Sequence, residues 1–141
     1  NAIIGNSDIK IIENDTYNLL NHSDLAVVTS GTATLETALF QVPQVVCYKA
    51  SSISYQIAKR LIKIKYISLV NLIMDKEVVT ELIQNDLTAK NIKVELNKIS
   101  EHNSVGRNEM LNHYKLLIES LGGGGASDEV ARLMFDKLSN E

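Results

Sequence analysis

The sequence predicts an α/β protein in which helices flank a parallel sheet. Three observations support this class. Short apolar runs alternate with stretches of helical periodicity along the first two-thirds of the chain, and the connections between them are short. One run, LAVVT at residues 25–29, is apolar without alternation, as in strands covered on both faces. The apolar share of 45% and the charged share of 22% are typical of a globular protein.

The first third of the chain is expected to hold three strands and two helices. In order, these are a strand at 9–12, a helix at 15–23, a strand at 25–29, a helix at 33–40 and a strand at 42–48. Asp15 is placed to cap the first helix. Pro43, the single proline, lies at the entry to the last of these strands.

The rest of the chain is expected to be mainly helical, because apolar residues recur every three to four positions. The predicted elements are a helix at 51–65, an extended segment at 66–73, and helices at 75–86, 89–99, 107–121 and 126–138. Asp75 and Thr88 are the expected caps of the helices that follow them.

Four consecutive glycines at 122–125 separate the last helix from the rest of the chain. Such a run forms a pliant joint, which fits either a flexible turn or a hinge that carries the helix elsewhere. An apolar stripe on this helix needs a partner surface; it consists of Val130, Leu133, Met134 and Leu138. We therefore expect one domain at 1–121, and at 122–141 a hinge and helix that cross to another domain or subunit, including a second copy of the chain.

Charge and cysteine content restrict the function classes. The net charge of −3 argues against a nucleic-acid partner. The single cysteine, Cys47, is expected to be a small core residue and fits a reducing, cytoplasmic setting. No stretch approaches the roughly 18 apolar residues that span a bilayer. Because the chain begins without Met and in mid-pattern, we interpret it as a domain of a longer protein.

The turn Thr-Ser-Gly-Thr at 29–32 is the first candidate site, because it joins a predicted strand to a predicted helix. Ligands of open parallel sheets bind at the carboxyl ends of the strands, and helix N-termini attract anions. Gly31 allows close approach of the backbone, and Ser30 and Thr32 supply hydroxyl groups. The motif is neither a Walker loop nor a dinucleotide fingerprint. It is therefore either a plain cap formed by Ser30 or Thr32, or a seat for phosphate.

Glu36 lies one helical turn beyond Thr32 on the same face. A carboxylate there suits a pair of ribose hydroxyls beside a pyrophosphate, although a first-turn Glu favoured by the helix dipole is the alternative. Tyr48 and Lys49 end a strand beside the turn and are within reach of a ligand, while Tyr48 also fits a core-edge aromatic.

No metal site is expected, because the chain has no Asp-x-Asp pair. The acids Asp75, Glu77 and Glu81 have the spacing of an exposed helix face. The basic cluster at 59–65 fits either the solvated side of a helix or a contact with anionic lipid headgroups or an acceptor phosphate.

Several motifs in order resemble the C-terminal half of the lipid-A-disaccharide synthases. They are SGTATLE at 30–36, P-x-V-V-x-Y-[KR] at 43–49, Y-[IV]-[SG]-L-x-N-L-[IL] at 66–73 and E-[VL]-V-x-E-L-[IL]-Q at 77–84. The resemblance runs from about residue 15 to the C-terminus and includes LGGGGAS at 121–127. Val70 stands where the family usually has proline, and Asp75-Lys76 where it often has Gly-Arg.

The resemblance implies a GT-B glycosyltransferase, in which two Rossmann-like domains face each other across a cleft. This chain is then expected to be the Rossmann-like, UDP-binding C-terminal half of the fold, with a helical C-terminus. The implied reaction transfers 2,3-diacylglucosamine from its UDP-sugar to lipid X with inversion, forming lipid A disaccharide 1-phosphate and releasing UDP. It needs no cofactor. The implied location is the cytoplasm, including a peripheral position on the inner membrane.

The resemblance also implies roles for individual residues. Glu36 would accept hydrogen bonds from the ribose, and Asn71 would be a donor-site asparagine, with Tyr48 and Lys49 as further candidates. The residues that would cradle the diphosphate are Ser30, Gly31, Thr32 and Ala33. The general base is expected in the N-terminal domain, so this chain would carry no catalytic residue and be inactive alone.

Two alternatives stay open. Another GT-B UDP-sugar enzyme, such as a peptidoglycan-type N-acetylglucosaminyl transferase or an epimerase, fits the SGT…E pattern but not YISLVNLI at 66–73. A non-catalytic nucleotide-binding or interaction module is the second alternative, with the glycine hinge serving oligomerisation.

Overall fold

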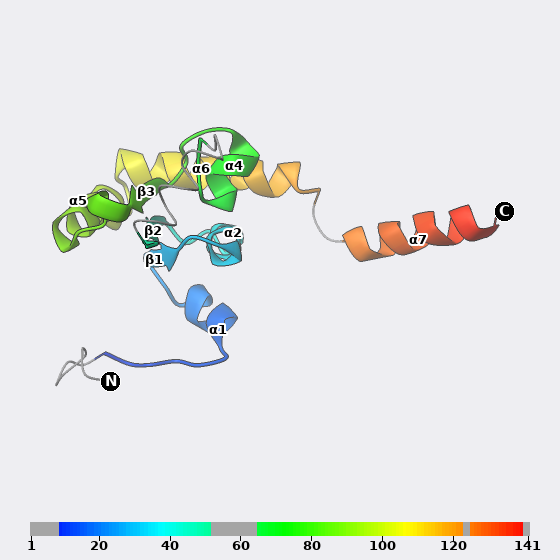
Figure 1. The fold of residues 1–141 in the computed structure, drawn as a ribbon, viewed down its shortest axis with the longest axis horizontal. Helices are drawn as coiled ribbons and strands as arrows, with labels where there is room; N and C mark the ends of the chain where they lie inside the picture. Colours follow the sequence, from blue (N-terminus) through cyan, green and yellow to red (C-terminus); the bar gives the residue numbers. More distant parts are fainter. Residues whose placement is uncertain (1–8, 52–64, 123–124, 140–141) are drawn as a thin grey trace.

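The computed structural model describes residues 9–51, 65–122 and 125–139. It confirms the α/β class: three parallel strands form an open sheet with helices around it and a further helix at the C-terminus (Figure 1). The strands are β1 (Ala26–Thr29), β2 (Gln44–Tyr48) and β3 (Thr80–Ile83), and β2 lies between the other two. This arrangement is that of a Rossmann-like half of a GT-B fold.

The register of the sheet brings the carboxyl ends of the strands to one edge. Thr29 of β1 lies opposite Cys47 of β2, and Cys47 lies opposite Leu82 of β3. The next pair along the same edge is Tyr48 with Ile83. The segments that follow the three strands therefore start side by side.

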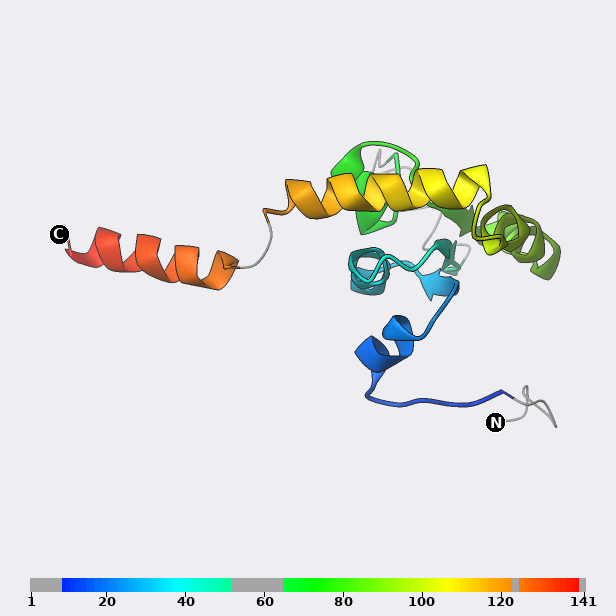
Figure 2. The ribbon, with the colours of Figure 1, turned by 180° about the vertical axis from the view of Figure 1, so that it is seen from behind.

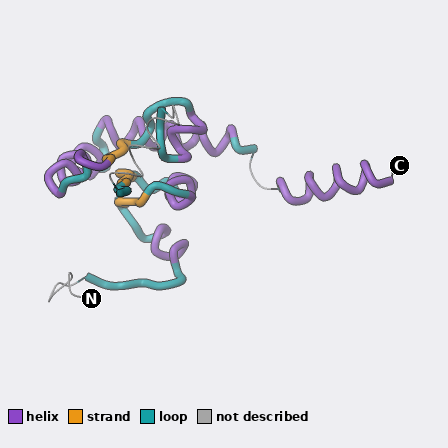
Figure 3. The backbone as a smooth tube through the Cα atoms, viewed as in Figure 1, coloured by secondary structure: helices purple, strands orange, loops and turns teal. Residues whose placement is uncertain are grey.

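Helices cover the sheet and form most of the core with it (Figure 3). In chain order, the helices of the described residues are α1 (Thr16–Asn21), α2 (Thr32–Leu39), α4 (Leu69–Met74), the 3-10 helix η1 (Gln84–Asp86), α5 (Ala89–Ser100), α6 (Val105–Ser120) and α7 (Ala126–Ser139). α2 packs against β1, β2, α4 and α6, whereas α5 packs against β2, β3 and α6. The core includes Val45, Val46, Val70, Val79, Tyr114 and Leu117.

Most of the predicted elements are confirmed. The strands expected at 25–29 and 42–48 are β1 and β2, and the helices expected at 15–23, 33–40, 89–99, 107–121 and 126–138 are α1, α2, α5, α6 and α7. Thr88 caps α5, since its Oγ1 accepts from Asn91 N at 3.1 Å. Asp15 occupies the cap position of α1, but its carboxylate accepts from the Asn18 side chain at 3.0 Å, not from a backbone N–H.

Two predictions about the first strands are wrong. Residues 9–12 are not a strand; Ile9 and Ile11 are 61% and 65% exposed, and the segment pairs with no other part of the described chain. β1 is not covered on both faces, because Val27 is 50% exposed and exposed residues alternate with partly buried ones along the strand. An apolar run forms a strand only where an adjacent strand provides partners for its backbone hydrogen bonds.

In residues 66–86 the helix and the extended segment occur in the opposite order to the prediction. The segment expected to be extended contains α4, and the expected helix at 75–86 contains β3 and η1. Ser68 caps α4, and Asp75 ends this helix in a left-handed conformation with φ 46° and does not begin a new one. The β-branched residues at 78–80 favour the strand that pairs with β2.

The helix expected at 51–65 and nearly all of the basic cluster at 59–65 lie outside the described residues. Lys65, the last residue of both, is described, and its Nζ lies 3.4 Å from Asp75 Oδ1. Within the described ranges, none of the helices is both long enough and apolar enough to cross a membrane. α7 extends away from the other helices in both ribbon views (Figures 1 and 2).

Candidate functional site

The turn between β1 and α2 lies at the carboxyl edge of the sheet, as the sequence predicts. Ser30 N donates to Cys47 O at 3.0 Å, so the turn starts as a continuation of the sheet. Gly31 then takes φ 155° and ψ −163°, a backbone region essentially restricted to glycine. A Cβ atom there would meet nothing within 4 Å. Glycine is therefore required by the backbone conformation and not by lack of space.

The N-terminus of α2 has no side-chain cap. Ser30 Oγ donates away from the helix, to Ile67 O at 2.9 Å, and Thr32 is exposed. Thr34 N bonds to Gly31 O at 3.2 Å, which leaves the N–H groups of Thr32 and Ala33 ahead of the first intrahelical bond. Neither Ser30 nor Thr32 acts as a plain cap, and the exposed donors have the geometry of an anion seat.

Glu36 lies one turn further along α2 and is partly buried. Among the described residues, no donor bonds to its carboxylate. The side chain lines a surface hollow of about 350 Å³ together with residues at the start of α1, namely Asn14, Asp15, Thr16 and Tyr17. Glu36 is thus an acceptor next to an open space, as a contact with hydroxyl groups requires.

Tyr48 and Lys49 also lie at the carboxyl edge. Tyr48 is the last residue of β2 and is partly buried, and Lys49 follows it and is exposed. Lys49 brings a positive charge to the edge that carries the turn. Cys47, just before them, is partly buried and not fully enclosed in the core, and burial raises the pKa of its thiol. A thiol with a raised pKa is a poor nucleophile at neutral pH.

Asn71 is fully buried, and its amide group is saturated by protein partners. Its Nδ2 donates to Val79 O at 2.8 Å and to Glu81 Oε1 at 2.9 Å. Its Oδ1 accepts from Val78 N at 2.8 Å and from Val79 N at 3.0 Å. The side chain therefore holds the 78–81 segment against α4 and does not face the turn as a free group.

Glu81 is the centre of a hydrogen-bond cluster that the sequence analysis missed. Its carboxylate accepts from Ile67 N, Ser68 N, Ser68 Oγ and Asn71 Nδ2, at 2.7 to 3.0 Å by the shortest bond to each. The expected exposed acidic helix face at 75–81 is therefore wrong for this residue, which belongs to β3. The available signal was a glutamate inside the apolar run VVTELI, since a buried carboxylate needs donors.

Gln84 is a second residue at this edge that the sequence analysis did not single out. It follows β3 directly and has a left-handed backbone with φ 53°. Its Oε1 accepts from Ala50 N at 3.2 Å, which ties the segment after β2 to the segment after β3. A left-handed glutamine carries no sequence signal, because glycine and asparagine are the residues expected there.

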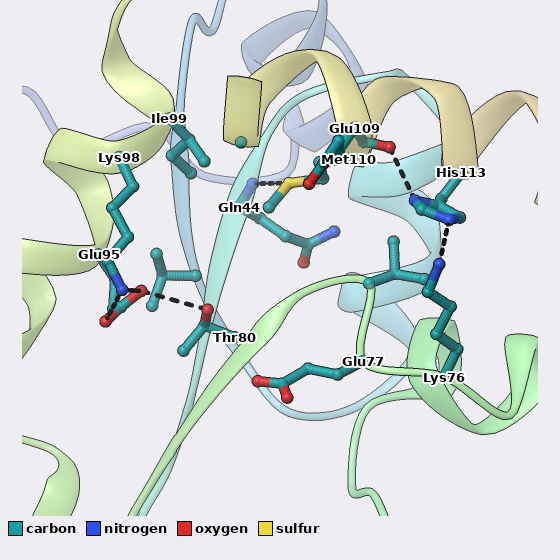
Figure 4. A pocket seen from close by; sticks show the side chains of 13 residues that line it. Gln44, Lys76, Glu77, Thr80, Glu95, Lys98, Ile99, Glu109, Met110 and His113 are labelled. Carbon is teal, nitrogen blue, oxygen red and sulfur yellow. Dashed lines mark hydrogen bonds and ion pairs between the residues drawn. The ribbon is translucent and has the colours of Figure 1, made fainter. Parts of the chain in front are cut away.

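A cavity of about 350 Å³ lies at the opposite edge, where β2 and β3 begin with Gln44 and Thr80 (Figure 4). Lys76 Nζ lies 2.6 Å from His113 Nε2, and Glu95 accepts from Lys98 at 2.7 Å. The Oε1 of Gln44 is buried without a partner in the described chain. None of the predicted site residues lines this cavity.

A family model described as lipid-A-disaccharide synthetase matches residues 4–131. The chain belongs to this family. Its members are bacterial glycosyltransferases of lipid A biosynthesis, so the resemblance drawn from the motifs is confirmed.

Curated lipid-A-disaccharide synthases align with most of the chain. The protein of Geobacter sulfurreducens is 33% identical over 134 residues, which cover 95% of this chain and 35% of that protein. The protein of Trichlorobacter lovleyi is 36% identical over 133 residues, covering 92% and 34%. The protein of Solibacter usitatus is 43% identical over 89 residues, covering 63% and 23%. The chain thus spans about a third of the length of the first two synthases.

Proposed function

We propose that this chain is the donor-binding part of a lipid-A-disaccharide synthase. It holds the UDP group of UDP-2,3-diacylglucosamine while the sugar is transferred to lipid X. The observation that carries the proposal is the N-terminus of α2, which has no side-chain cap and lies at the carboxyl edge of the sheet. One turn beyond it is the carboxylate of Glu36, to which no donor among the described residues bonds. Family membership supplies the reaction in which such a seat is used.

In this proposal the diphosphate lies on the N–H groups of Thr32 and Ala33, next to Gly31. The positive end of the helix dipole then stabilises the negative charge that develops on UDP as the acceptor hydroxyl bonds to the anomeric carbon and the bond from that carbon to the UDP phosphate oxygen breaks. Lys49, exposed at the same edge, adds a countercharge. Ser30 contributes differently from the expectation, because its hydroxyl proton is directed to Ile67 O and so holds the turn in place.

Glu36 accepts the ribose hydroxyls in this proposal, since it has no donor among the described residues and faces the hollow beside α1. Tyr48 lies at the rim of the site as a candidate contact. In this proposal Asn71 supports the site without contacting the nucleotide, because its amide group is hydrogen-bonded to the backbone of residues 78–79 and to Glu81.

The general base and the lipid X site are proposed to belong to the remaining two-thirds of the family's length. The chain alone is then expected to bind UDP without transferring sugar. A cytoplasmic location with peripheral membrane contact follows from the proposed lipid substrates. A second copy of the chain, packed on α7, is the proposed protein partner.

Titration calorimetry of the chain with UDP tests the proposal, with ADP as the comparison nucleotide. Glu36→Ala is expected to weaken UDP binding by about 1–2 kcal/mol, roughly 5- to 30-fold, as for a lost hydrogen bond to a charged group. Glu101→Ala is the matched control, since Glu101 is exposed at the end of α5, far along the chain from the turn. No heat with UDP would favour an interaction module, and equal affinity of Glu36→Ala would exclude the ribose role.

A further inference from the structure

We infer that Glu81 is a positioning residue of the nucleotide site, although it does not lie in the turn that would contact the ligand. Its carboxylate fixes the 67–68 segment, and the Ile67 carbonyl in turn fixes the hydroxyl of Ser30. The inference rests on the proposed function, and it assigns to Glu81 control over the shape of the diphosphate seat.

The first link is the set of bonds to the Glu81 carboxylate. Oε1 accepts from Ser68 Oγ at 2.7 Å, from Ser68 N at 2.9 Å and from Asn71 Nδ2 at 2.9 Å, and Oε2 accepts from Ile67 N at 3.0 Å. A carboxylate is the side chain that suits this position, because it accepts at both oxygens and donates at neither. A glutamine here would place an NH₂ group against surrounding donors.

The second link is the bond from Ser30 Oγ to Ile67 O at 2.9 Å. Glu81 holds the N–H of Ile67, while Ser30 holds its carbonyl oxygen, so the residue is bonded from both sides. Ser30 N is also bonded to Cys47 O at 3.0 Å. Segments at 30, 47, 67–68 and 81 thus form one connected unit across all three strands and the start of α4.

The unit ends at the proposed seat. Ser30 immediately precedes Gly31, and the first N–H groups of α2, which have no side-chain cap among the described residues, begin one residue later. Donors that stabilise a leaving group act only when they are held in place before the charge develops. A turn released from Ile67 is expected to lose part of this preorganisation while the helix itself remains.

The neighbouring glutamate does not share this arrangement. Glu77 is exposed, lines the cavity at the opposite edge and has no hydrogen bond of its side chain within the described residues. It therefore offers a control in which the same charge is removed four residues away. Ser30→Ala offers a test of the second link without touching Glu81.

The experiment measures UDP affinity by calorimetry for Glu81→Gln, Ser30→Ala, the double variant and Glu77→Gln. Glu81→Gln is expected to weaken binding roughly 5- to 30-fold, on the order of one lost hydrogen bond to a charged group. Ser30→Ala is expected to weaken it roughly 2- to 12-fold, because the bond from its hydroxyl to the Ile67 carbonyl joins two neutral groups. The double variant is expected to bind UDP as tightly as the single variant with the larger loss of affinity, because both substitutions break the same chain of hydrogen bonds. Glu77→Gln is expected to bind as the unchanged chain does.

Amide hydrogen exchange without nucleotide gives a second readout that does not depend on UDP binding. Glu81→Gln is expected to accelerate exchange at the Ser30 amide, relative to Val46 in the central strand, and Glu77→Gln is not. If the unchanged chain fails to bind UDP, the proposed function fails, while the Ser30 amide still decides whether Glu81 fixes the turn.

Three results overturn the inference. The first is a Glu81→Gln chain with a lowered urea midpoint but unchanged UDP affinity under folded conditions, which would make the role structural only. The second is strict additivity of the two affinity losses. The third is an exchange rate at Ser30 that does not change. If Glu81→Gln does not fold, Ser30→Ala alone decides the question. In that case the inference is overturned if Ser30→Ala changes neither the UDP affinity nor the hydrogen-exchange rate of the turn amides.

Discussion

Glu36 and Glu81 show how the surroundings of a carboxylate set its role. Glu36 faces the hollow beside α1 and has no donor among the described residues. Glu81 is partly buried and accepts from Ile67, Ser68 and Asn71. A carboxylate with free acceptor capacity is available to a ligand, whereas a saturated one fixes the protein around it. The two residues are therefore assigned to binding and to positioning, respectively.

Tyr114 carries the clearest effect of burial on a titrating group. The side chain is fully buried, and loss of solvation raises the pKa of its phenol well above the ordinary value. Its oxygen accepts from Gln44 Nε2 at 3.2 Å, a bond that opposes the shift only in part. The phenol therefore stays protonated in the folded chain at pH values where an exposed tyrosine ionises.

This shift predicts a loss of stability in alkali. The unfolded chain releases the Tyr114 proton at about pH 10, while the folded chain retains it, so rising pH stabilises the unfolded state. The contribution of protonated Tyr114 to the free energy of unfolding is fully present below about pH 10 and declines as the pH rises towards the folded-state pKa. Urea unfolding between about pH 9 and 11 measures it. Tyr114→Phe is expected to lose less stability over this range, and an equal loss in both proteins would contradict the assignment.

Among the helices, α4 and α5 both begin at a capped N-terminus, but the two caps have different surroundings. Thr88 is exposed, and its hydroxyl accepts from Asn91 N at 3.1 Å. Ser68 is fully buried; its hydroxyl accepts from Asn71 N at 3.3 Å and also donates to Glu81 at 2.7 Å. The Ser68 cap is therefore part of the cluster that joins α4 to β3.

The two caps provide a matched pair of substitutions. Thr88→Ala is expected to lower the free energy of unfolding by about 1 kcal/mol, as an exposed cap does. Ser68→Ala is expected to cost about 2–4 kcal/mol, because it also removes a donor from the partly buried Glu81 carboxylate. Urea denaturation of both variants checks the difference. Equal losses would show that the Ser68–Glu81 bond contributes little.

At the scale of the whole molecule, α7 presents an apolar surface that no other part of the described chain covers. α7 extends away from the packed helices (Figure 2), and five of its apolar side chains are each more than half exposed. They are Val130, Leu133, Met134, Phe135 and Leu138. An exposed apolar surface of this kind is typical of an interaction site. The glycines at 122 and 125, both with positive φ, connect this helix to α6.

Self-association is the consequence we expect from this surface. Sedimentation velocity of the chain should show a mass above the 15.6 kDa monomer that increases with protein concentration. Leu133→Ser with Leu138→Ser is expected to shift the population to monomer, because it removes apolar area from the stripe. Lys137→Ser in the same helix is the control. A strict monomer at all concentrations would contradict the assignment of a second copy as partner.

The motif SGTATLE and its place after an apolar strand were enough to predict the turn at the carboxyl edge of the sheet and the helix α2 that contains Glu36. Both depend on local patterns: a strand-to-helix turn, and a spacing of four within one helix. The Thr88 cap of α5 was predicted correctly, whereas Asp15 makes no side-chain bond to the backbone of α1 and Asp75 ends α4 and begins no helix. The family, too, followed from motifs in order along the chain, as the match to residues 4–131 confirms.

The structure of 66–86 depended instead on contacts between distant residues. Val78, Val79 and Thr80 fit a helix or a strand by periodicity, and pairing of this segment with β2 settles the choice. Asn71 and Glu81 looked like a ligand residue and a solvated acid, yet each is bonded to partners 7 to 14 residues away. Ser30 bonds to Ile67, 37 residues on. Composition and spacing report local preference, whereas the partner of a buried polar group is fixed only when the chain packs.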